Sequence, residues 1–138
     1  MSEINTEYFQ KCIDTVVKSY DFLKKSEIGS IEYEVFRNSL VKGLEITLEQ
    51  SGKLLKKKLV PFMASKKAAD MLTFKEIFRQ ANKCSLISSE ETERWMKYRD
   101  NRNSTAHDYG VSFAEETLKL IPDFLTDVQN LKKIIDND

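Results

Sequence analysis

The sequence predicts an all-α fold, an antiparallel up-and-down bundle of four to five helices. Apolar side chains recur at spacings of three and four residues along most of the chain, which is typical of amphipathic helices. Only four glycines and two prolines are present, too few for the turns of a sandwich or barrel. The 138 residues are enough to enclose one hydrophobic core, so we expect a single domain over residues 1–138.

The first two predicted helices are long and are separated by a glycine. The apolar spacing predicts a first helix over residues 4–26, and Gly29-Ser30 ends it. A second helix is predicted from Ile31 to Pro61, where the proline ring stops it. The segment over residues 62–72 has a mixed pattern and is expected to form a short helix or a loop.

The later helices are predicted from their starts. Thr73 is expected to cap a third helix, and Ser88 with Glu91 forms the capping-box pattern that opens a fourth. Ser112 and Glu115 repeat that pattern before the last helix.

One proline is expected to distort the last helix. Pro122 lies well inside it, and a proline there removes one backbone donor and clashes with the preceding turn. The sequence therefore predicts a kink in this helix.

Charge and cysteine content restrict the function classes. With 22 basic and 22 acidic side chains, the net charge is zero, so no overall field attracts nucleic acid or membrane. Six lysines and no acid lie between Ser51 and Lys67, a stretch that is either a phosphate-binding patch or, as we favour, a solvated helix face.

The chain is expected to be cytoplasmic. Cys12 and Cys84 occupy apolar helical positions and are predicted to be small buried thiols in a reducing compartment. The first residues lack the basic and apolar regions of a secretory signal, and no window approaches the length of a membrane span. We therefore expect no membrane association.

The single histidine lies in the run from Arg99 to Gly110. Arg102 and His107 are five residues apart, about 140° around an ideal helix, so they converge only if the helix ends between them or the arginine reaches around. Gly110 is a suitable helix terminator. An ordinary, partly buried histidine remains the alternative interpretation of this residue.

The chemistry available to Arg102 and His107 is RNA cleavage without a metal or other cofactor. An imidazole can take a proton from a ribose 2′-hydroxyl, and a guanidinium can stabilise charge on the adjacent phosphate. Cleavage also needs an acid for the leaving oxygen, which a second histidine would supply in a homodimer.

Other classes of site have little support in the sequence. No Gly-rich phosphate loop, Ser-His-Asp arrangement or zinc-ligand cluster is present, and the fourth helix is not basic enough for a DNA-recognition helix. Glu45 and Glu49 share a helix face and could bind a cation, although a solvated face or an ion pair with Lys53 is commoner.

The run Arg102-Asn103-x3-His107-x-Tyr109 resembles the signature of HEPN domains, and more narrowly that of HepT-type toxins, also described as nucleotidyltransferase substrate-binding proteins. Three further features resemble the same family over residues 40–110. They are the Leu44–Glu49 block followed by Lys53–Lys56, the Lys75–Ala81 block followed by Leu86-Ile87, and Trp95. Gly52 departs from the family pattern, because relatives often carry a bulky aromatic there, and the segment Val60–Leu72 is longer than usual.

The resemblance implies an RNase toxin that dimerises, with the two Arg-His motifs meeting at a cleft and tRNA among the RNA substrates. It also implies a cognate minimal nucleotidyltransferase, encoded nearby, that acts as antitoxin by attaching AMP to Tyr109. We assign Arg102 and His107 as catalytic, Asn103 as orienting the motif, and Asp108 and Arg99 as supporting. Two alternatives stay open: a non-catalytic subunit that binds nucleotide or substrate for a nucleotidyltransferase, and a purely structural partner.

Overall fold

The structure, a computed structural model, describes residues 4–105 and 111–137, without the side chains of residues 102–105 and 111–114. Within the described residues it contains six α-helices, a short 3-10 helix and no strand. The predicted all-α class is therefore confirmed. The helix number is one more than expected because the mixed segment after Pro61 includes a separate short helix.

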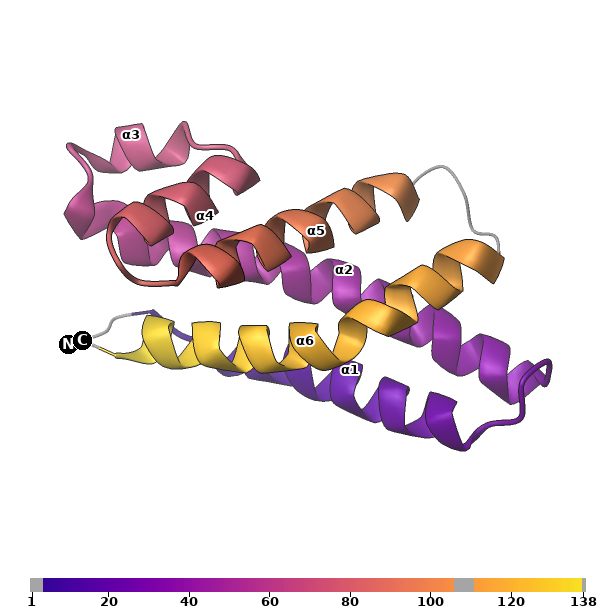
Figure 1. Ribbon diagram of the computed structural model, residues 1–138. Coiled ribbons are helices and arrows are strands. Elements are labelled where there is room, and N and C mark those ends of the chain that lie inside the picture. The colour runs from indigo at the N-terminus through magenta and orange to yellow at the C-terminus, as the bar shows by residue number, and fades with distance from the viewer. Residues whose placement is uncertain (1–3, 106–110, 138) are drawn as a thin grey trace.

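Four long helices form the up-and-down framework. They are α1 (Glu7–Lys25), α2 (Ile31–Leu59), α5 (Ser89–Thr105) and α6 (Val111–Asp136). Figure 1 shows α2 returning antiparallel to α1, and α6 returning antiparallel to α5. The start of α1 and the end of α6 lie at the same end of the bundle, where Thr6 Oγ1 donates a hydrogen bond to Asp136 Oδ1 at 2.7 Å.

The turn between α1 and α2 follows from its local sequence. Gly29 has a φ of +92°, a left-handed conformation that glycine adopts without the steric penalty of a side chain. Ser30 then caps α2, because its hydroxyl accepts a hydrogen bond from the Tyr33 backbone N–H at 3.1 Å.

Two short elements follow α2 before the chain returns to the bundle. The 3-10 helix Val60–Phe62 contains Pro61, which ends α2 as predicted, and α3 spans Lys66–Asp70. Lys56 of α2 and Lys66 of α3 both contact the Asp70 carboxylate, at 3.3 and 3.0 Å. The predicted choice between a short helix and a loop is thus resolved in favour of a short helix.

Two of the three helix starts predicted from capping residues are confirmed. Thr73 caps α4 (Phe74–Lys83) with a reciprocal bond to Glu76. At the start of α5, Glu91 N–H donates to Ser88 Oγ at 3.0 Å, and Ser88 N–H donates to Glu91 Oε1 at 3.2 Å.

The predicted start of the last helix at Ser112 is wrong by a small margin. The helix α6 already begins at Val111, so Ser112 lies inside its first turn. The first N–H groups of a helix have no partner within it, and a serine is tolerated there as well as just before it. Pro122 lies inside α6, and Figure 1 shows this helix changing direction part-way along its length, as the proline predicts.

The hydrophobic core lies around α2, which contacts α1, α4, α5 and α6. Trp95, Phe78 and Phe124 are among its largest fully buried aromatic side chains. The free thiol of Cys12 is buried as predicted, whereas Cys84 is only half-buried. In the described part of the chain, no helix is long and apolar enough to cross a membrane.

Candidate functional site

The helix that carries the Arg-His motif, α5, is fixed to α6 by a buried carboxylate. Asp127 of α6 accepts two hydrogen bonds from Arg94, from Nε at 2.8 Å and from Nη2 at 2.9 Å. It also accepts one from the Tyr98 hydroxyl at 2.5 Å. Asp127 is 1% exposed, so its charge depends on these donors in place of water. Burial, and then the hydrogen bond to Asp127, raise the pKa of Tyr98 far above its usual range, which keeps the hydroxyl protonated as a donor.

A cluster of aromatic side chains packs α5 against α4 and α6. Trp95 of α5 stacks on Phe78 of α4 at 4.7 Å between ring centroids, and it meets Phe124 of α6 edge-on at 5.8 Å. Tyr98 also packs edge-on against Phe124 at 5.1 Å. These contacts hold α4, α5 and α6 in fixed register, since aromatic pairs in this range are attractive in these orientations.

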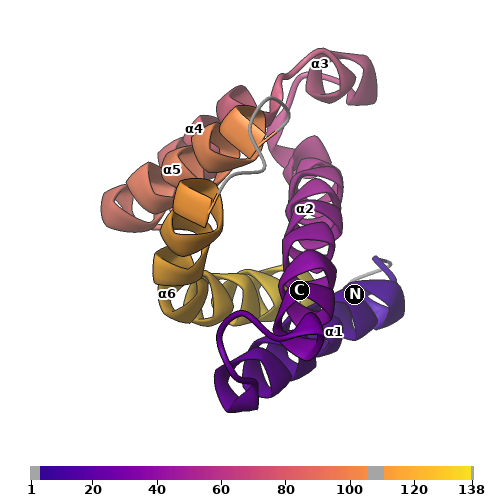
Figure 2. The same cartoon turned by 90° about the vertical axis from the view of Figure 1, so that its right-hand side faces the viewer.

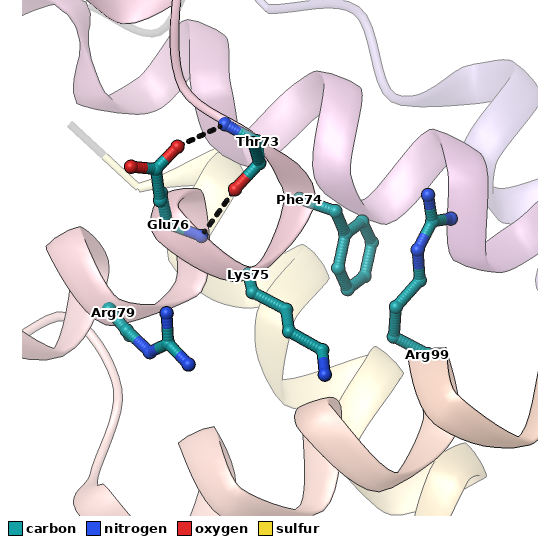
Figure 3. A pocket seen from close by; sticks show the side chains of 6 residues that line it. All are labelled: Thr73, Phe74, Lys75, Glu76, Arg79 and Arg99. Atoms are coloured by element: carbon teal, nitrogen blue, oxygen red, sulfur yellow. Dashed lines mark hydrogen bonds between the residues drawn. The ribbon is translucent and has the colours of Figure 1, made fainter. Parts of the chain in front are cut away.

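One further aromatic ring links α2 to the surface. The Phe74 ring of α4 lies against Gly52 of α2, so closely that a Cβ on Gly52 would be 2.8 Å from Phe74 Cδ2. Outside it, the Arg99 guanidinium lies over the Phe74 ring, 4.9 Å from the centroid (Figure 3). Gly52, noted above as a departure from the family pattern, therefore makes room for an aromatic ring supplied by another helix.

The Gly52–Phe74 contact predicts a measurable cost for Gly52→Ala. The added methyl group must displace the ring, and overpacking of this kind costs about 1–3 kcal/mol. Alanine recovers up to about 1 kcal/mol of helix propensity, so we expect a net loss of about 1 kcal/mol in the free energy of unfolding, measured by urea denaturation. In a Phe74→Ala background the same substitution should become stabilising. A loss of equal size in both backgrounds would contradict the contact.

A shallow pocket opens beside Arg99 on the α4–α5 surface. It has a volume of about 430 Å³ and is lined by Thr73, Phe74, Lys75, Glu76, Arg79 and Arg99 (Figure 3). The sequence reasoning included Arg99 but missed Lys75 and Arg79 as site residues. Their spacing of four residues, which puts them on one helix face, was the available signal.

The structure places the predicted site residues only in part. Arg99 lines the pocket on α5, and the backbone of α5 continues through Arg102 and Asn103 to Thr105. The side chains of Arg102 and Asn103 lie outside the described residues, as do His107, Asp108 and Tyr109 entirely. Figure 2 views the end of the molecule where α5 stops and α6 begins.

Several of the other charged residues considered in the sequence have polar partners in the structure. In the basic stretch, Lys56 contacts Asp70, and the Lys58 ammonium donates to the Asn137 carbonyl. Glu45 contacts Lys42 at 3.9 Å across one turn of α2. Among the described residues no group of acidic, histidine or cysteine side chains has the arrangement of a metal site.

Comparison with known proteins assigns a family. Residues 5–137 match the family described as "Nucleotidyltransferase substrate binding protein like". The chain is also 30% identical to a protein of Haemophilus influenzae named "Probable ribonuclease HepT", over 96 residues that make up 70% of this chain. The aligned segment spans 64% of that relative.

Two solved structures share the fold. One, from Haemophilus influenzae, is described as the fold of a substrate-binding domain of a nucleotidyltransferase. It superposes with a TM-score of 0.81 at 22% sequence identity, and the match covers 96% of this chain and 100% of the other chain. The other, from Thermus thermophilus, has a TM-score of 0.75 at 21% sequence identity, and the match covers 94% of this chain and 99% of the other chain. With the family match extending over residues 5–137, the chain belongs to the nucleotidyltransferase substrate-binding protein-like family.

Proposed function

We propose that the protein is an RNase toxin that cleaves RNA, with tRNA as one substrate class, without a metal ion. The observation that carries this proposal is the sequence order Arg102-Asn103-x3-His107-x-Tyr109, which begins in the last turn of α5, in a member of this family. The relative named as a probable ribonuclease supports it.

The proposed chemistry uses one proton-transfer group and one fixed cation from each chain. His107 takes the proton of a ribose 2′-hydroxyl, and the 2′-oxygen attacks the adjacent phosphorus. Arg102 stabilises the charge that develops on the phosphate oxygens, and Asn103 orients the motif, with Arg99 and Asp108 in support. The bond from phosphorus to the 5′-oxygen breaks, and the partner subunit's His107 protonates that oxygen. The products are a 2′,3′-cyclic phosphate and a 5′-hydroxyl.

The anchored geometry of α5 suits this role. The hydrogen bonds that Arg94 and Tyr98 donate to Asp127 fix the position of α5 along its axis, one to two turns before Arg102. This anchoring supports the proposal, because groups carried on a rigid helix stabilise a transition state more strongly than groups on a mobile segment.

We further propose that a cognate minimal nucleotidyltransferase silences the toxin by attaching AMP to Tyr109. The added phosphate would bring bulk and negative charge beside Arg102, where the RNA phosphate must bind. A second candidate function is a non-catalytic subunit that presents substrate to a nucleotidyltransferase. The family description and the solved substrate-binding domain favour it.

Growth experiments separate the two functions. Expression of the chain alone should stop bacterial growth, because an unsilenced RNase depletes RNA, and Arg102→Ala should restore growth. Co-expression of the neighbouring nucleotidyltransferase should also restore growth, with added AMP on Tyr109 detected by mass spectrometry.

The outcomes have distinct meanings. Normal growth with the wild-type chain, at a protein level confirmed by immunoblot, would contradict the toxin and leave the substrate-binding subunit. Restored growth with an unmodified Tyr109 would contradict AMPylation but not the RNase. Arg37→Ala, which changes an arginine on α2 distant in sequence from the motif, serves as the matched control and should not restore growth.

A further inference from the structure

The pocket on the α4–α5 surface brings Lys75 and Arg79, which are not part of the catalytic motif, beside Arg99. We propose that Lys75, Arg79 and Arg99, here called the α4–α5 basic surface, bind phosphates of single-stranded RNA next to the cleaved bond. This proposal rests on the proposed function for the RNA substrate, and it assigns a binding role to Lys75 and Arg79 of α4.

The three side chains come together from two helices. Lys75 and Arg79 are four residues apart on α4 and therefore lie on one face. Arg99 reaches the same pocket from α5. Figure 3 shows Lys75 between Arg79 and Arg99, so the three side chains are spread over both helices. Such a spread suits several successive phosphates better than a single phosphate.

The nearby carboxylates are already engaged. Glu76 Oε1 accepts a hydrogen bond from the Thr73 backbone N–H at 2.8 Å, and this bond is the main reason that the pKa of Glu76 is lowered. Figure 3 shows Glu76 turned towards Thr73. Asp100 contacts Lys75 Nζ at 2.6 Å. The charge of Arg79 also contributes to the lowered pKa of Glu76, although within the described part of the chain no salt bridge joins Arg79 or Arg99 to Glu76.

Arg99 is held in a suitable orientation. Its guanidinium lies over the Phe74 ring at 4.9 Å, and the ring is itself fixed against Gly52. A guanidinium held over a ring can still offer N–H groups for a bidentate contact with phosphate. Because Arg99 lies over the Phe74 ring, we expect this surface to contact the phosphate groups of the RNA. We do not expect a nucleotide base to stack on that ring.

The position of the surface relative to the motif decides the ligand class. Arg99 precedes Arg102 by three residues, which is about 4.5 Å along the helix axis. A ligand that contacts both Arg102 on α5 and Arg79 on α4 must bridge two helices, and an RNA strand supplies successive phosphates for this. Since the whole chain has zero net charge, local clusters of this kind must supply the electrostatic affinity for RNA.

Binding of an uncleavable RNA tests the proposal independently of catalysis. The probe is a fluorescein-labelled, fully 2′-O-methylated single-stranded oligonucleotide, and the readout is the Kd from fluorescence anisotropy at several salt concentrations. For Arg79→Gln we expect Kd to rise about fivefold, and the slope of log K against log salt to fall by about 0.7, as for one lost phosphate contact on a single strand. Arg79→Lys should retain most of the affinity, and the double variant Lys75→Gln/Arg79→Gln should lose more.

The matched control is Lys18→Gln, which removes one exposed cation from α1 and should change neither Kd nor slope. Arg79 is exposed, so its variants should melt like the wild type. Unchanged binding in Arg79→Gln would overturn the proposal, as would Arg79-dependent binding of ATP without binding of the oligonucleotide. Arg79-dependent RNA binding by a chain that cuts no RNA would instead overturn the RNase and leave this surface standing.

Discussion

Replacement of Asp127 by alanine should destabilise the protein by about 3 kcal/mol, at the lower end of the cost of breaking a buried ion pair. The substitution leaves the buried Tyr98 hydroxyl and the Arg94 guanidinium without their shared acceptor. The Arg94 side chain is 35% exposed and can regain water, whereas the Tyr98 residue is 3% exposed and cannot easily do so. Urea denaturation followed by circular dichroism measures the change.

Two further variants separate the contributions to this network. Tyr98→Phe removes one donor but keeps the Arg94 pair, so we expect a loss of about 1 kcal/mol. Asp123→Ala removes an exposed carboxylate one turn earlier on α6 and should change stability by less than about 0.5 kcal/mol. If Asp127→Ala costs no more than Asp123→Ala, the carboxylate does not anchor α5.

The largest expected effect on activity is that of His107→Ala. Purified wild-type chain, expressed without the proposed partner nucleotidyltransferase, should cleave RNA with EDTA present. The alanine variant should retain at most about one hundredth of that rate, because general acid–base groups contribute roughly 10²- to 10⁴-fold. The measurement is the rate of loss of full-length RNA on a denaturing gel.

The control is Lys18→Ala, which should cleave at the wild-type rate because it changes an exposed residue of α1. Equal circular dichroism melting curves for the three proteins would exclude loss of fold as the cause. Cleavage that persists in His107→Ala, or that EDTA abolishes in the wild type, would contradict the proposed chemistry.

Most of the helical framework was predictable because its signals are local. Apolar spacing located the long helices, and the Thr73–Glu76 and Ser88–Glu91 boxes located two helix starts, since such caps depend only on residues three apart. The start of α6 was misplaced by two residues, because a cap at Ser112 puts the first helical residue at Phe113 whereas α6 begins at Val111.

The parts that sequence reasoning missed depend on contacts between distant segments. Arg94 and Asp127 are 33 residues apart, and no spacing rule pairs them. In the sequence, Gly52 only departs from the family pattern. The structure shows that the Phe74 ring of α4 fills the space beside Gly52 that a larger side chain would occupy. The α4–α5 basic surface was likewise hidden, because Lys75 and Arg79 meet Arg99 through the tertiary fold. The assignments of Arg102, Asn103, His107, Asp108 and Tyr109 stay predictions.

The chemical ends of the RNA products test the central claim most directly. An RNA of defined sequence, cut by the purified chain in EDTA, should yield a 2′,3′-cyclic phosphate and a 5′-hydroxyl, as identified by mass spectrometry. The same RNA with a single 2′-deoxy nucleotide on the 5′ side of the cut should not be cleaved there. A 3′-hydroxyl with a 5′-phosphate, or unchanged cleavage of the 2′-deoxy substrate, would contradict proton abstraction from the 2′-hydroxyl by His107.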